Sequence, residues 1–391
     1  MRMSVAVIRT PLSPIDYTFL GESAYPIEFL FKFQGRLDCE AMRRSLERVL
    51  ADFPPVASLL KKTGSSTFAF ETSPHACPFT VVETEADPDL QGPAAYDLLD
   101  PVSTVAGQPL ARFELTLGPV LSVLGVSLSH AIVDGYSCFY FLSAWAAACR
   151  GESYRSPVHE RSLLTPADLP EMDLSEEAIR EGTGWSLAGE RNAPARESLC
   201  WTRLVFSNET LKADAAQASD ATGMRISVND ALVVRLWKRF AFEWPGSGER
   251  RFLSIPVDFR RVYPEIDLRY FGNAVRGVTL SRTKSELESE SLAELAAAVH
   301  RAVASVKADT VLHSLRQLEA LRRAEGPEAL SRLHVAHPEA GLLVTNLSRV
   351  PVARLDFGSG APSDYRIMTP APRTAAVLPL QDGCAVDVCP P

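Results

Sequence analysis

The sequence predicts a mixed α/β or α+β protein that is divided into two domains. Its 391 residues accommodate two or three domains at about 150 residues each. Strand-like and helix-like hydrophobic patterns occur in both halves of the chain. Between the halves, residues 151–195 contain several prolines and glycines and show little periodicity. Such a composition is typical of a crossover between two folded units.

The first half is expected to begin with a buried strand at residues 27–34, whose sequence IEFLFKFQ is mostly apolar. Asp38 then precedes a pattern in which Met42, Leu46 and Val49 recur at the spacing of one helix face. The remaining elements of this half are four strands and one long helix, expected at residues 67–71, 79–83, 110–116 and 120–128 for the strands and 135–149 for the helix.

The second half is expected to restart with a strand at residues 200–206. Ser227 and Asp230 then resemble a capping box, although Asp replaces the usual Glu or Gln, and they predict a helix start. The later elements are strands at residues 252–257, 274–280, 342–346 and 385–389, and helices at 286–308 and 310–325. The first of these helices presents an apolar face that we expect in the core, made of Leu292, Leu295, Val299 and Val303.

Composition and charge exclude several classes of protein. Hydrophobic residues make up 46% and charged residues 23% of the chain, which excludes a disordered or fibrous protein. The formal net charge of −8 disfavours a nucleic-acid binder that works by neutralising phosphates. Seven cysteines without a C-x-x-C pair favour reduced thiols. No apolar run reaches the roughly 20 residues of a membrane helix, so we expect a cytoplasmic protein.

The clearest chemical signal is HAIVDG at residues 130–135, between an apolar strand and a helix start. His130 would stand at the strand end, Asp134 would enter the turn, and Gly135 would allow a backbone shape that a Cβ forbids. On spacing alone, two interpretations stay open. His130 is either a buried, satisfied histidine beside an Asp N-cap, or a base at an active site.

Further motifs follow in order along the chain. They are LSPID at residues 12–16, SVNDALVVRLW at 227–237, VDFR at 257–260, YFGNAV at 270–275 and DFGSG at 356–360. Together with HAIVDG, they resemble the motifs of the HXXXD acyltransferases, and in particular of the BAHD family. The resemblance spans about residues 12–389, with Ser359 standing where the family has Trp.

The resemblance implies an α/β fold of two chloramphenicol-acetyltransferase-like domains, each a mixed sheet flanked by helices, with the active-site tunnel at their interface. The expected division is an N-terminal domain at 1–175 with HAIVDG, a crossover linker at 176–198, and a C-terminal domain at 199–391 with YFGNAV and DFGSG. Acyl-CoA would be a co-substrate, with no permanently bound cofactor. His130 would act as general base, without a covalent acyl-enzyme.

The resemblance also assigns roles to other positions. Asp134, Gly135 and Arg260 would be structural at the active site, with Asp134 and Arg260 forming a buried ion pair. The roles of the remaining positions would be an oxyanion or substrate contact at Thr345 and Asn346, and a structural turn at Asp356, Gly358 and Gly360.

Candidates outside the motifs carry less weight. Arg250 and Arg251 could bind CoA phosphates, because the net-acidic chain needs a local basic patch for that ligand. The pairs His75–Cys77 and His334–His337 lack the ligand spacing of a zinc site, so no metal is expected. Cys138 lies in a Phe-rich helix, which favours a small core residue over a nucleophile.

We therefore expect acyl transfer from acyl-CoA to a hydroxyl of a small, specialised-metabolite acceptor, by a monomer that binds neither nucleic acid nor membrane. One alternative is amide formation, or condensation-type transfer from a carrier protein. The other is an inactive relative that only binds a small molecule, an alternative that Ser359 favours and the intact His130, Asp134, Gly135 and Arg260 disfavour.

Overall fold

The computed structural model describes residues 7–191, 195–196 and 199–391, and most of its strands belong to two large sheets. The first sheet has five strands in the spatial order β14-β2-β7-β6-β5. β7 pairs antiparallel with both β2 and β6, whereas β5 runs parallel to β6. The bounds of these strands are Ile27–Gln34 (β2), Phe79–Glu83 (β5), Ala111–Leu117 (β6), Leu121–Leu128 (β7) and Asp364–Ile367 (β14).

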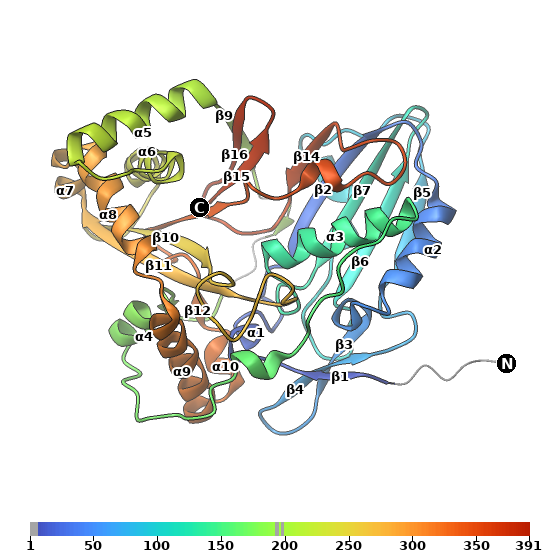
Figure 1. Cartoon of the computed structure of the whole chain (residues 1–391), viewed down its shortest axis with the longest axis horizontal. Coiled ribbons are helices and arrows are strands. Elements are labelled where there is room, and N and C mark those ends of the chain that lie inside the picture. The colour runs from blue at the N-terminus through green and yellow to red at the C-terminus, as the bar shows by residue number, and fades with distance from the viewer. Residues whose placement is uncertain (1–6, 192–194, 197–198) are drawn as a thin grey trace.

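Two helices, α2 (Cys39–Val49) and α3 (Gly135–Cys149), pack against each other beside the first sheet (Figure 1). α2 begins where the Asp38 carboxylate accepts a hydrogen bond from the Ala41 amide at 2.9 Å, as an N-cap does. Most residues of α3 are buried, which explains why its sequence is apolar on nearly every side.

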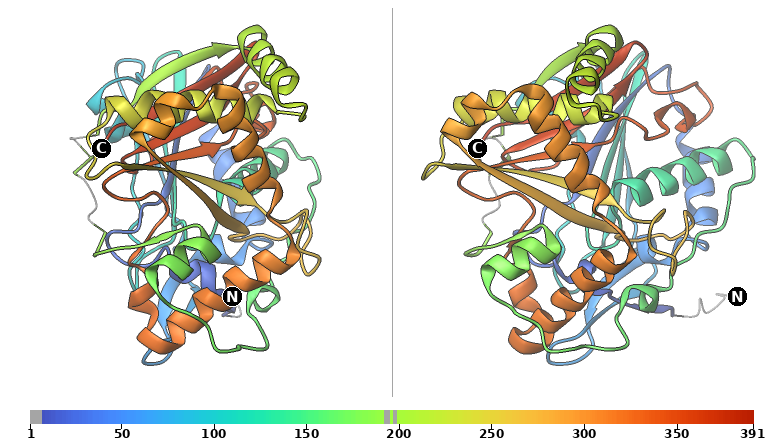
Figure 2. Two further views of the ribbon diagram at one scale, coloured as in Figure 1. Left: turned by 90° about the vertical axis from the view of Figure 1, so that its left-hand side faces the viewer. Right: turned by 60° about the vertical axis from the view of Figure 1, so that its left-hand side comes forward.

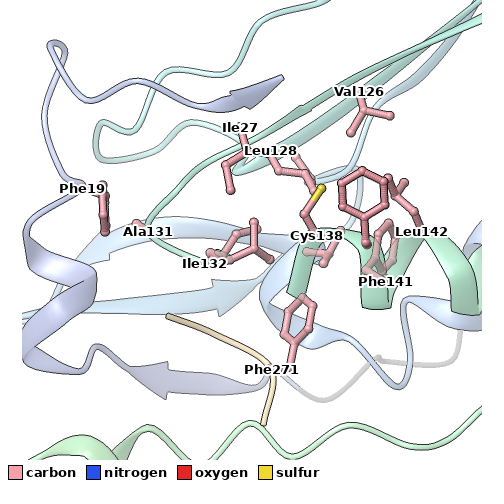
Figure 3. Close-up of a cluster of buried hydrophobic side chains, with 14 of the residues drawn as sticks. Phe19, Ile27, Val126, Leu128, Ala131, Ile132, Cys138, Phe141, Leu142 and Phe271 are labelled. Carbon is pink, nitrogen blue, oxygen red and sulfur yellow. The ribbon is translucent and has the colours of Figure 1, made fainter. Parts of the chain in front are cut away.

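The side chains of α3 fill the core of the first half. Figure 3 shows Cys138, Phe141 and Leu142 of this helix near Val126 and Leu128 of β7, and each of these five side chains is fully buried. This packing fixes the start of α3, and with it the turn that carries HAIVDG, relative to the sheet.

The second sheet has six strands in the order β11-β10-β13-β15-β16-β9. β13 lies between β10 and β15 and is parallel to both, while the other neighbours are antiparallel. The bounds are Thr202–Ser207 (β9), Arg250–Asp258 (β10), Val275–Thr283 (β11), Gly341–Asn346 (β13), Thr374–Leu380 (β15) and Gly383–Cys389 (β16).

Helices gather on one side of the second sheet, as Figure 2 shows from two directions. They are α5 (Asn208–Thr222), α6 (Val228–Glu243), α7 (Lys284–Ser289) and α8 (Leu292–Ala304). The predicted capping box at Ser227 is confirmed, since the Ser227 hydroxyl accepts from the Asp230 amide at 3.1 Å and the Asp230 carboxylate from the Ser227 amide at 2.9 Å.

The remaining elements lie outside the two large sheets. Three strands form a small sheet, and they are β1 (Arg9–Pro11), β3 (Ser58–Lys62) and β4 (Phe68–Thr72). Two short strands pair with each other, β8 (Ser186–Leu187) and β12 (Leu333–His334). The other helices are α1 (Pro14–Tyr17), α4 (Glu176–Thr183), α9 (Ala308–Glu325) and α10 (Pro327–Leu330), with short 3₁₀ turns at Pro54–Ala57, Pro93–Leu98, Arg161–Leu164 and Val352–Arg354.

Several sequence predictions need correction. The helix expected at 286–308 is two helices, because Ser291 and Glu294 form a capping box that begins α8. As a consequence, Leu292 lies in the first turn and its side chain is exposed rather than in the core. The segment 151–195 contains the helix α4, which starts at the N-cap Ser175.

The predicted division of the chain at residues 176–198 stays a prediction, and residues 192–194 and 197–198 of that linker lie outside the described residues. β14 comes from the late part of the chain, yet it pairs with β2 of the first sheet, with Asp364 opposite Lys32. In the described part of the chain, no helix is long and apolar enough to cross a membrane.

Candidate active site

A cavity of about 1220 Å³ lies between the two halves of the molecule. One wall comes from α3 and the turn before it, and the facing wall comes from β10, β11, β13 and the loop after β13. His130, Asp134 and Gly135 line the cavity together with Thr345 and Asn346. The structure therefore brings residues from distant motifs to one site, which is large enough for a small molecule and a long-chain donor.

The charge of the cavity wall is opposite to that of the whole protein. Arginines outnumber carboxylates among the lining residues, and the arginines are Arg150, Arg155, Arg261, Arg269, Arg276, Arg349 and Arg354. The lining carboxylates are Asp134, Glu152 and Asp258. A cleft with this excess of cations attracts anionic ligands even though the chain carries a net charge of −8.

His130 lies on the turn between β7 and α3, and the residue as a whole is partly exposed. The ring stacks on Phe19, with 3.8 Å between ring centroids and 12° between planes. Burial lowers the pKa of His130 below its usual value of 6.5, while its own backbone carbonyl and Asp134 act in the opposite direction. The ring is thus neutral at pH 7, the state that can accept a proton.

Asp134 lines the cavity, but its carboxylate is buried and pairs with Arg260 in the interior. The Arg260 Nη1 lies 2.8 Å from the Asp134 Oδ2, and both side chains are almost completely buried. The Asp134 carboxylate also accepts hydrogen bonds from the amides of Ser137 (2.8 Å) and Ala274 (2.9 Å). Burial would raise the pKa of Asp134, but Arg260 and these amides lower it below 3.8, so Asp134 is ionised at neutral pH.

Arg260 ties the start of α3 to the second half through further hydrogen bonds. Its guanidinium donates to the hydroxyl of Ser137 at 2.9 Å and to the carbonyls of Gly272 and Tyr270 at 2.8 and 3.1 Å. Ser137 also accepts from the Gly272 amide and donates to the Gly272 carbonyl. The VDFR, YFGNAV and HAIVDG segments therefore meet at one buried, charged contact that fixes the orientation of the His130 turn.

A second buried ion pair supports the other side of this turn, and one of its two residues, Arg161, was not predicted. Asp16, from LSPID, lies 3.0 Å from Arg161, and neither side chain is exposed. Asn273, from YFGNAV, donates to the Asp16 carboxylate at 2.9 Å and to the His130 carbonyl at 2.8 Å. Arg161 donates to the Ile132 carbonyl at 3.0 Å. Arg161 lies in the proline-rich crossover, outside every motif, so no local pattern marks it.

Three further predicted residues line the cavity, and they are Gly135, Thr345 and Asn346. A Cβ at Gly135 would lie 2.9 Å from the Leu347 Cδ2, so glycine keeps that space open. The side-chain nitrogen of Asn346 donates to the side-chain oxygen of Asn229, from the SVND segment. The side-chain oxygen of Asn346 accepts from the backbone amide of Ser348. The Thr345 hydroxyl makes no hydrogen bond with the described residues, which leaves it available to a ligand.

The DFGSG segment forms a turn outside the cavity. The Asp356 carboxylate accepts hydrogen bonds from the amides of Gly358 (2.7 Å) and Gly360 (2.9 Å), and both glycines have positive φ. Arg150, which lines the cavity, donates to the Asp356 carbonyl. Ser359, at the position of the family Trp, is exposed on this turn.

Arg250 and Arg251 lie away from this cavity, so the structure gives no support to their proposed contact with CoA. The Arg251 guanidinium is buried and donates to the carbonyls of Ala241 and Gly248. Arg250 donates to the Ser281 hydroxyl on the neighbouring strand. Their contact with CoA stays a prediction without structural support; the two residues are adjacent on β10, where alternate residues point to opposite faces.

The remaining sequence candidates do not form a reactive site. Burial raises the pKa of the Cys138 thiol, so it stays protonated in the core. His337 stacks on Phe252 with 4.3 Å between centroids. In residues 7–191, 195–196 and 199–391, no group of three or more His, Cys, Asp or Glu could hold a metal ion.

Comparison with known proteins places the chain in a family. The family model described as "Transferase family" matches residues 115–389. Rosmarinate synthase of Plectranthus scutellarioides is 26% identical over 368 residues, covering 89% of this chain and 82% of that protein. A hydroxycinnamoyl-CoA:5-hydroxyanthranilate N-hydroxycinnamoyltransferase of Avena sativa is 23% identical over 350 residues, covering 84% of this chain and 77% of that protein.

A solved structure shares the fold. TRI101 of F. graminearum, complexed with ethyl coenzyme A, has a TM-score of 0.79 at 16% identity and covers 98% of this chain and 95% of its own. This likeness confirms the predicted fold, two domains of the chloramphenicol-acetyltransferase type.

Proposed function

This chain belongs to the BAHD family of acyl-CoA-dependent acyltransferases, and on that premise we propose that it transfers an acyl group from acyl-CoA to a hydroxyl of a small specialised metabolite. The observation that carries the proposal is the neutral, partly exposed His130 in a cation-lined cavity between the two halves. The direct test is to incubate the protein with a panel of acyl-CoAs and acceptors and to measure the release of free CoA thiol. No thiol release with any pair would contradict the proposal.

In this mechanism His130 is the general base. Its ring nitrogen takes the proton from the acceptor hydroxyl while the hydroxyl oxygen attacks the thioester carbonyl. The tetrahedral intermediate then collapses, the carbon–sulfur bond breaks, and the protonated imidazole returns the proton to the CoA thiolate. General-base help of this kind contributes about 10²–10⁴-fold to the rate.

Of the two predicted contacts on β13, we propose Thr345 as the donor for the developing oxyanion. Its hydroxyl belongs to the cavity wall and has no other partner in the described residues, whereas the Asn346 amide is already bonded to Asn229. A hydrogen bond that strengthens as negative charge develops on the carbonyl oxygen lowers the activation free energy by about 3 kcal/mol. Thr345 therefore replaces the Thr345–Asn346 pair as the proposed contact.

The pH dependence of the reaction follows from the environment of His130. Because burial lowers the pKa of His130, we expect kcat/KM to rise with pH through a midpoint below 6.5 and to be level at pH 7 and above. Asp134 raises this pKa, so Asp134→Asn should move the midpoint further down. A midpoint at or above 6.5 in the wild type, measured with an acceptor that does not titrate in this range, would contradict the assignment.

Binding of the acyl-CoA donor is expected to depend on Arg261 and Arg269, which line the cavity from the loop between β10 and β11. Both side chains are exposed, and CoA carries several phosphate charges. We expect CoA binding to weaken as salt rises, because charges at a wet rim are screened over about 8–10 Å. The double variant Arg261→Ala/Arg269→Ala should weaken CoA binding several-fold, as measured by isothermal titration calorimetry at low salt.

Arg250→Ala is the matched control, because Arg250 is an exposed arginine of the same half that does not line the cavity. It should bind CoA like the wild type. If instead no CoA binding is detected at millimolar concentration, and transfer occurs only from an acylated carrier protein, the carrier-dependent alternative replaces the acyl-CoA proposal.

Amide formation is a second candidate, favoured by the similarity to the Avena sativa N-hydroxycinnamoyltransferase. A neutral His130 can take a proton from an attacking amine as well as from a hydroxyl. Matched acceptors that differ only in an amine or a hydroxyl at the same position would decide between the two by their kcat/KM values.

A further inference from the structure

The His130 ring lacks the hydrogen bond that usually orients a histidine base. Such a bond joins the second ring nitrogen to a carbonyl or a carboxylate. Here the Nδ1 atom is buried without a hydrogen-bond partner in the described chain, and the Asp134 carboxylate pairs with Arg260 instead. The orientation of the imidazole must therefore come from the side chains that pack against it.

The side chain that packs flat against the imidazole is Phe19. The two rings are nearly parallel, with 3.8 Å between centroids and 12° between planes, and Phe19 is buried. Trp185 contacts the Phe19 ring edge-on at 6.2 Å. Figure 3 shows Phe19 beside Ala131, the residue that follows His130. Any contact that fixes Phe19 therefore also fixes the plane of the imidazole.

Arg191 holds the backbone on both sides of Phe19. Its Nη2 atom donates to the carbonyl of Thr18 at 2.7 Å and to that of Leu20 at 3.4 Å. The side chain is buried and forms no ion pair with a described carboxylate, and its Nε and Nη1 atoms have no hydrogen-bond partner. A buried charge without a counterion costs stability, and proteins accept such a cost typically at functional or strained sites.

Arg191 belongs to the crossover, just after a segment that the second half anchors. In that segment β8 pairs with β12, and the His334 Nε2 donates to the Gly189 carbonyl at 2.8 Å. The guanidinium also lies beside the cavity wall, because burial raises the pKa of the cavity residue Tyr25 and Arg191 lowers it. The crossover thus connects β12 to the segment that packs on His130.

We propose that Arg191 is a positioning residue of this acyltransferase, which holds the Phe19 ring against the His130 imidazole so that the base keeps one orientation in the cavity. The inference rests on the proposed role of His130 as base, but the ring stacking and its dependence on Arg191 require no transfer reaction. Arg191 itself does not line the cavity, so it acts through Phe19 and is not a catalytic residue.

Arg191 also places a positive charge near the base. The other charged side chains next to the His130 turn form two buried ion pairs, Asp134–Arg260 and Asp16–Arg161. Burial lowers the pKa of His130, its own carbonyl, Asp134 and Asn273 raise it, and Arg191 lowers it again. Loss of the guanidinium should therefore raise the pH at which His130 titrates, because protonation no longer meets a like charge.

Three variants break this arrangement at different points. Arg191→Met removes the charge and both hydrogen bonds but keeps a long side chain, whereas Arg191→Lys keeps the charge and loses the guanidinium. Phe19→Leu removes the ring and leaves Arg191 in place. The matched control is Arg373→Met, because Arg373 is also buried, donates to the carbonyl of Pro245 at 2.6 Å and does not line the cavity.

The experiment follows the His130 ring by NMR in the full chain, with carbon-13 at the ε1 position of its seven histidines. The His130 signal is the one that is absent from His130→Ala. Because the face of an aromatic ring shields a proton above it, the wild-type Hε1 signal should lie upfield of its position in the urea-unfolded protein. The titration midpoint of the same signal, kcat and the KM for acyl-CoA complete the measurement.

Arg191→Met and Phe19→Leu should lose the upfield shift and lower kcat by about tenfold to 10²-fold, with the KM for acyl-CoA near that of the wild type. Arg191→Met should also raise the titration midpoint. Arg191→Lys should lose part of the upfield shift and keep the midpoint, and together with Phe19→Leu it decides the matter if Arg191→Met fails to fold. Arg373→Met should keep the shift, the midpoint and kcat.

Three results would overturn the proposal. They are a wild-type His130 signal without the upfield shift, a folded Arg191→Met or Phe19→Leu protein that retains the wild-type shift or kcat, or an Arg191→Met protein with an unchanged midpoint, and an Arg373→Met protein that loses as much kcat as Arg191→Met. If the NMR shifts behave as expected but neither the wild type nor any variant transfers an acyl group, the proposed function fails and the positioning of the His130 ring stands.

Discussion

Replacing His130 with alanine should lower turnover by about 10²-fold or more while the protein stays folded. The His130 imidazole lines the cavity from the turn between β7 and α3, and burial lowers its pKa, so that it is neutral at pH 7. The backbone of that turn is held independently of the ring, because Asn273 and Arg161 bond to the carbonyls of His130 and Ile132. The loss should therefore appear in kcat, with CoA affinity near that of the wild type.

The measurement is the rate of thiol release at saturating acyl-CoA, together with the melting temperature and the CoA dissociation constant of the same sample. His313→Ala is the control, because His313 is exposed on α9 and does not line the cavity. It should retain full activity. Wild-type turnover in His130→Ala on the true substrate would remove His130 from the mechanism.

Much of the fold was predictable because residues close together in the sequence determine many of its elements. The strand at 27–34 and the helix at 135–149 have the bounds that were expected, since each is a mostly apolar segment that packs in the core. The capping boxes at Ser227 and Ser291 are also local signals, and the second was overlooked in favour of a longer hydrophobic periodicity.

The elements that were missed have weak local patterns. The buried face of α5 consists of Leu211, Ala215 and Ala218, and alanines give little contrast between the two faces of a helix. β15 contains a proline at position 379 and was not among the expected strands, yet it lies inside the second sheet between β13 and β16. Pairing between strands far apart in the chain stabilises it, and one sequence does not display such pairing.

The residues of the candidate site likewise divide into those that the sequence predicted and those that it did not. The resemblance to the family motifs predicted His130, Asp134 and Arg260, and it implied the buried Asp134–Arg260 pair that the structure shows. Arg161 escaped prediction, since its surroundings come from distant segments. Its partner is Asp16, which lies 145 positions earlier in the chain. Burial, which only the folded chain defines, distinguishes Arg161 from the exposed arginines at the rim of the cavity.

Asp134→Ala should destabilise the protein by about 3–5 kcal/mol, because it leaves the Arg260 guanidinium buried without its principal counterion. The amides of Ser137 and Ala274 would lose their acceptor at the same time. Asp134→Asn should be milder, since an amide oxygen still accepts one of these hydrogen bonds. The second carboxylate near Arg260 belongs to Asp258 at 3.1 Å, and it is partly exposed, so Asp258→Ala is the matched control with a smaller expected loss.

The loss should also depend on pH in a defined direction. The pKa of Asp134 in the folded protein lies below 3.8, so the ionised carboxylate stabilises the fold fully above that value and loses its effect as the pH falls through the folded pKa. The difference in unfolding free energy between wild type and Asp134→Ala, measured by urea denaturation, should therefore be constant from pH 5 to 8 and shrink below about pH 4. An Ala variant that unfolds like the wild type but has lost all activity would place Asp134 in the chemistry instead of the scaffold, because a group that only orients His130 cannot be removed from this buried contact without a cost in stability.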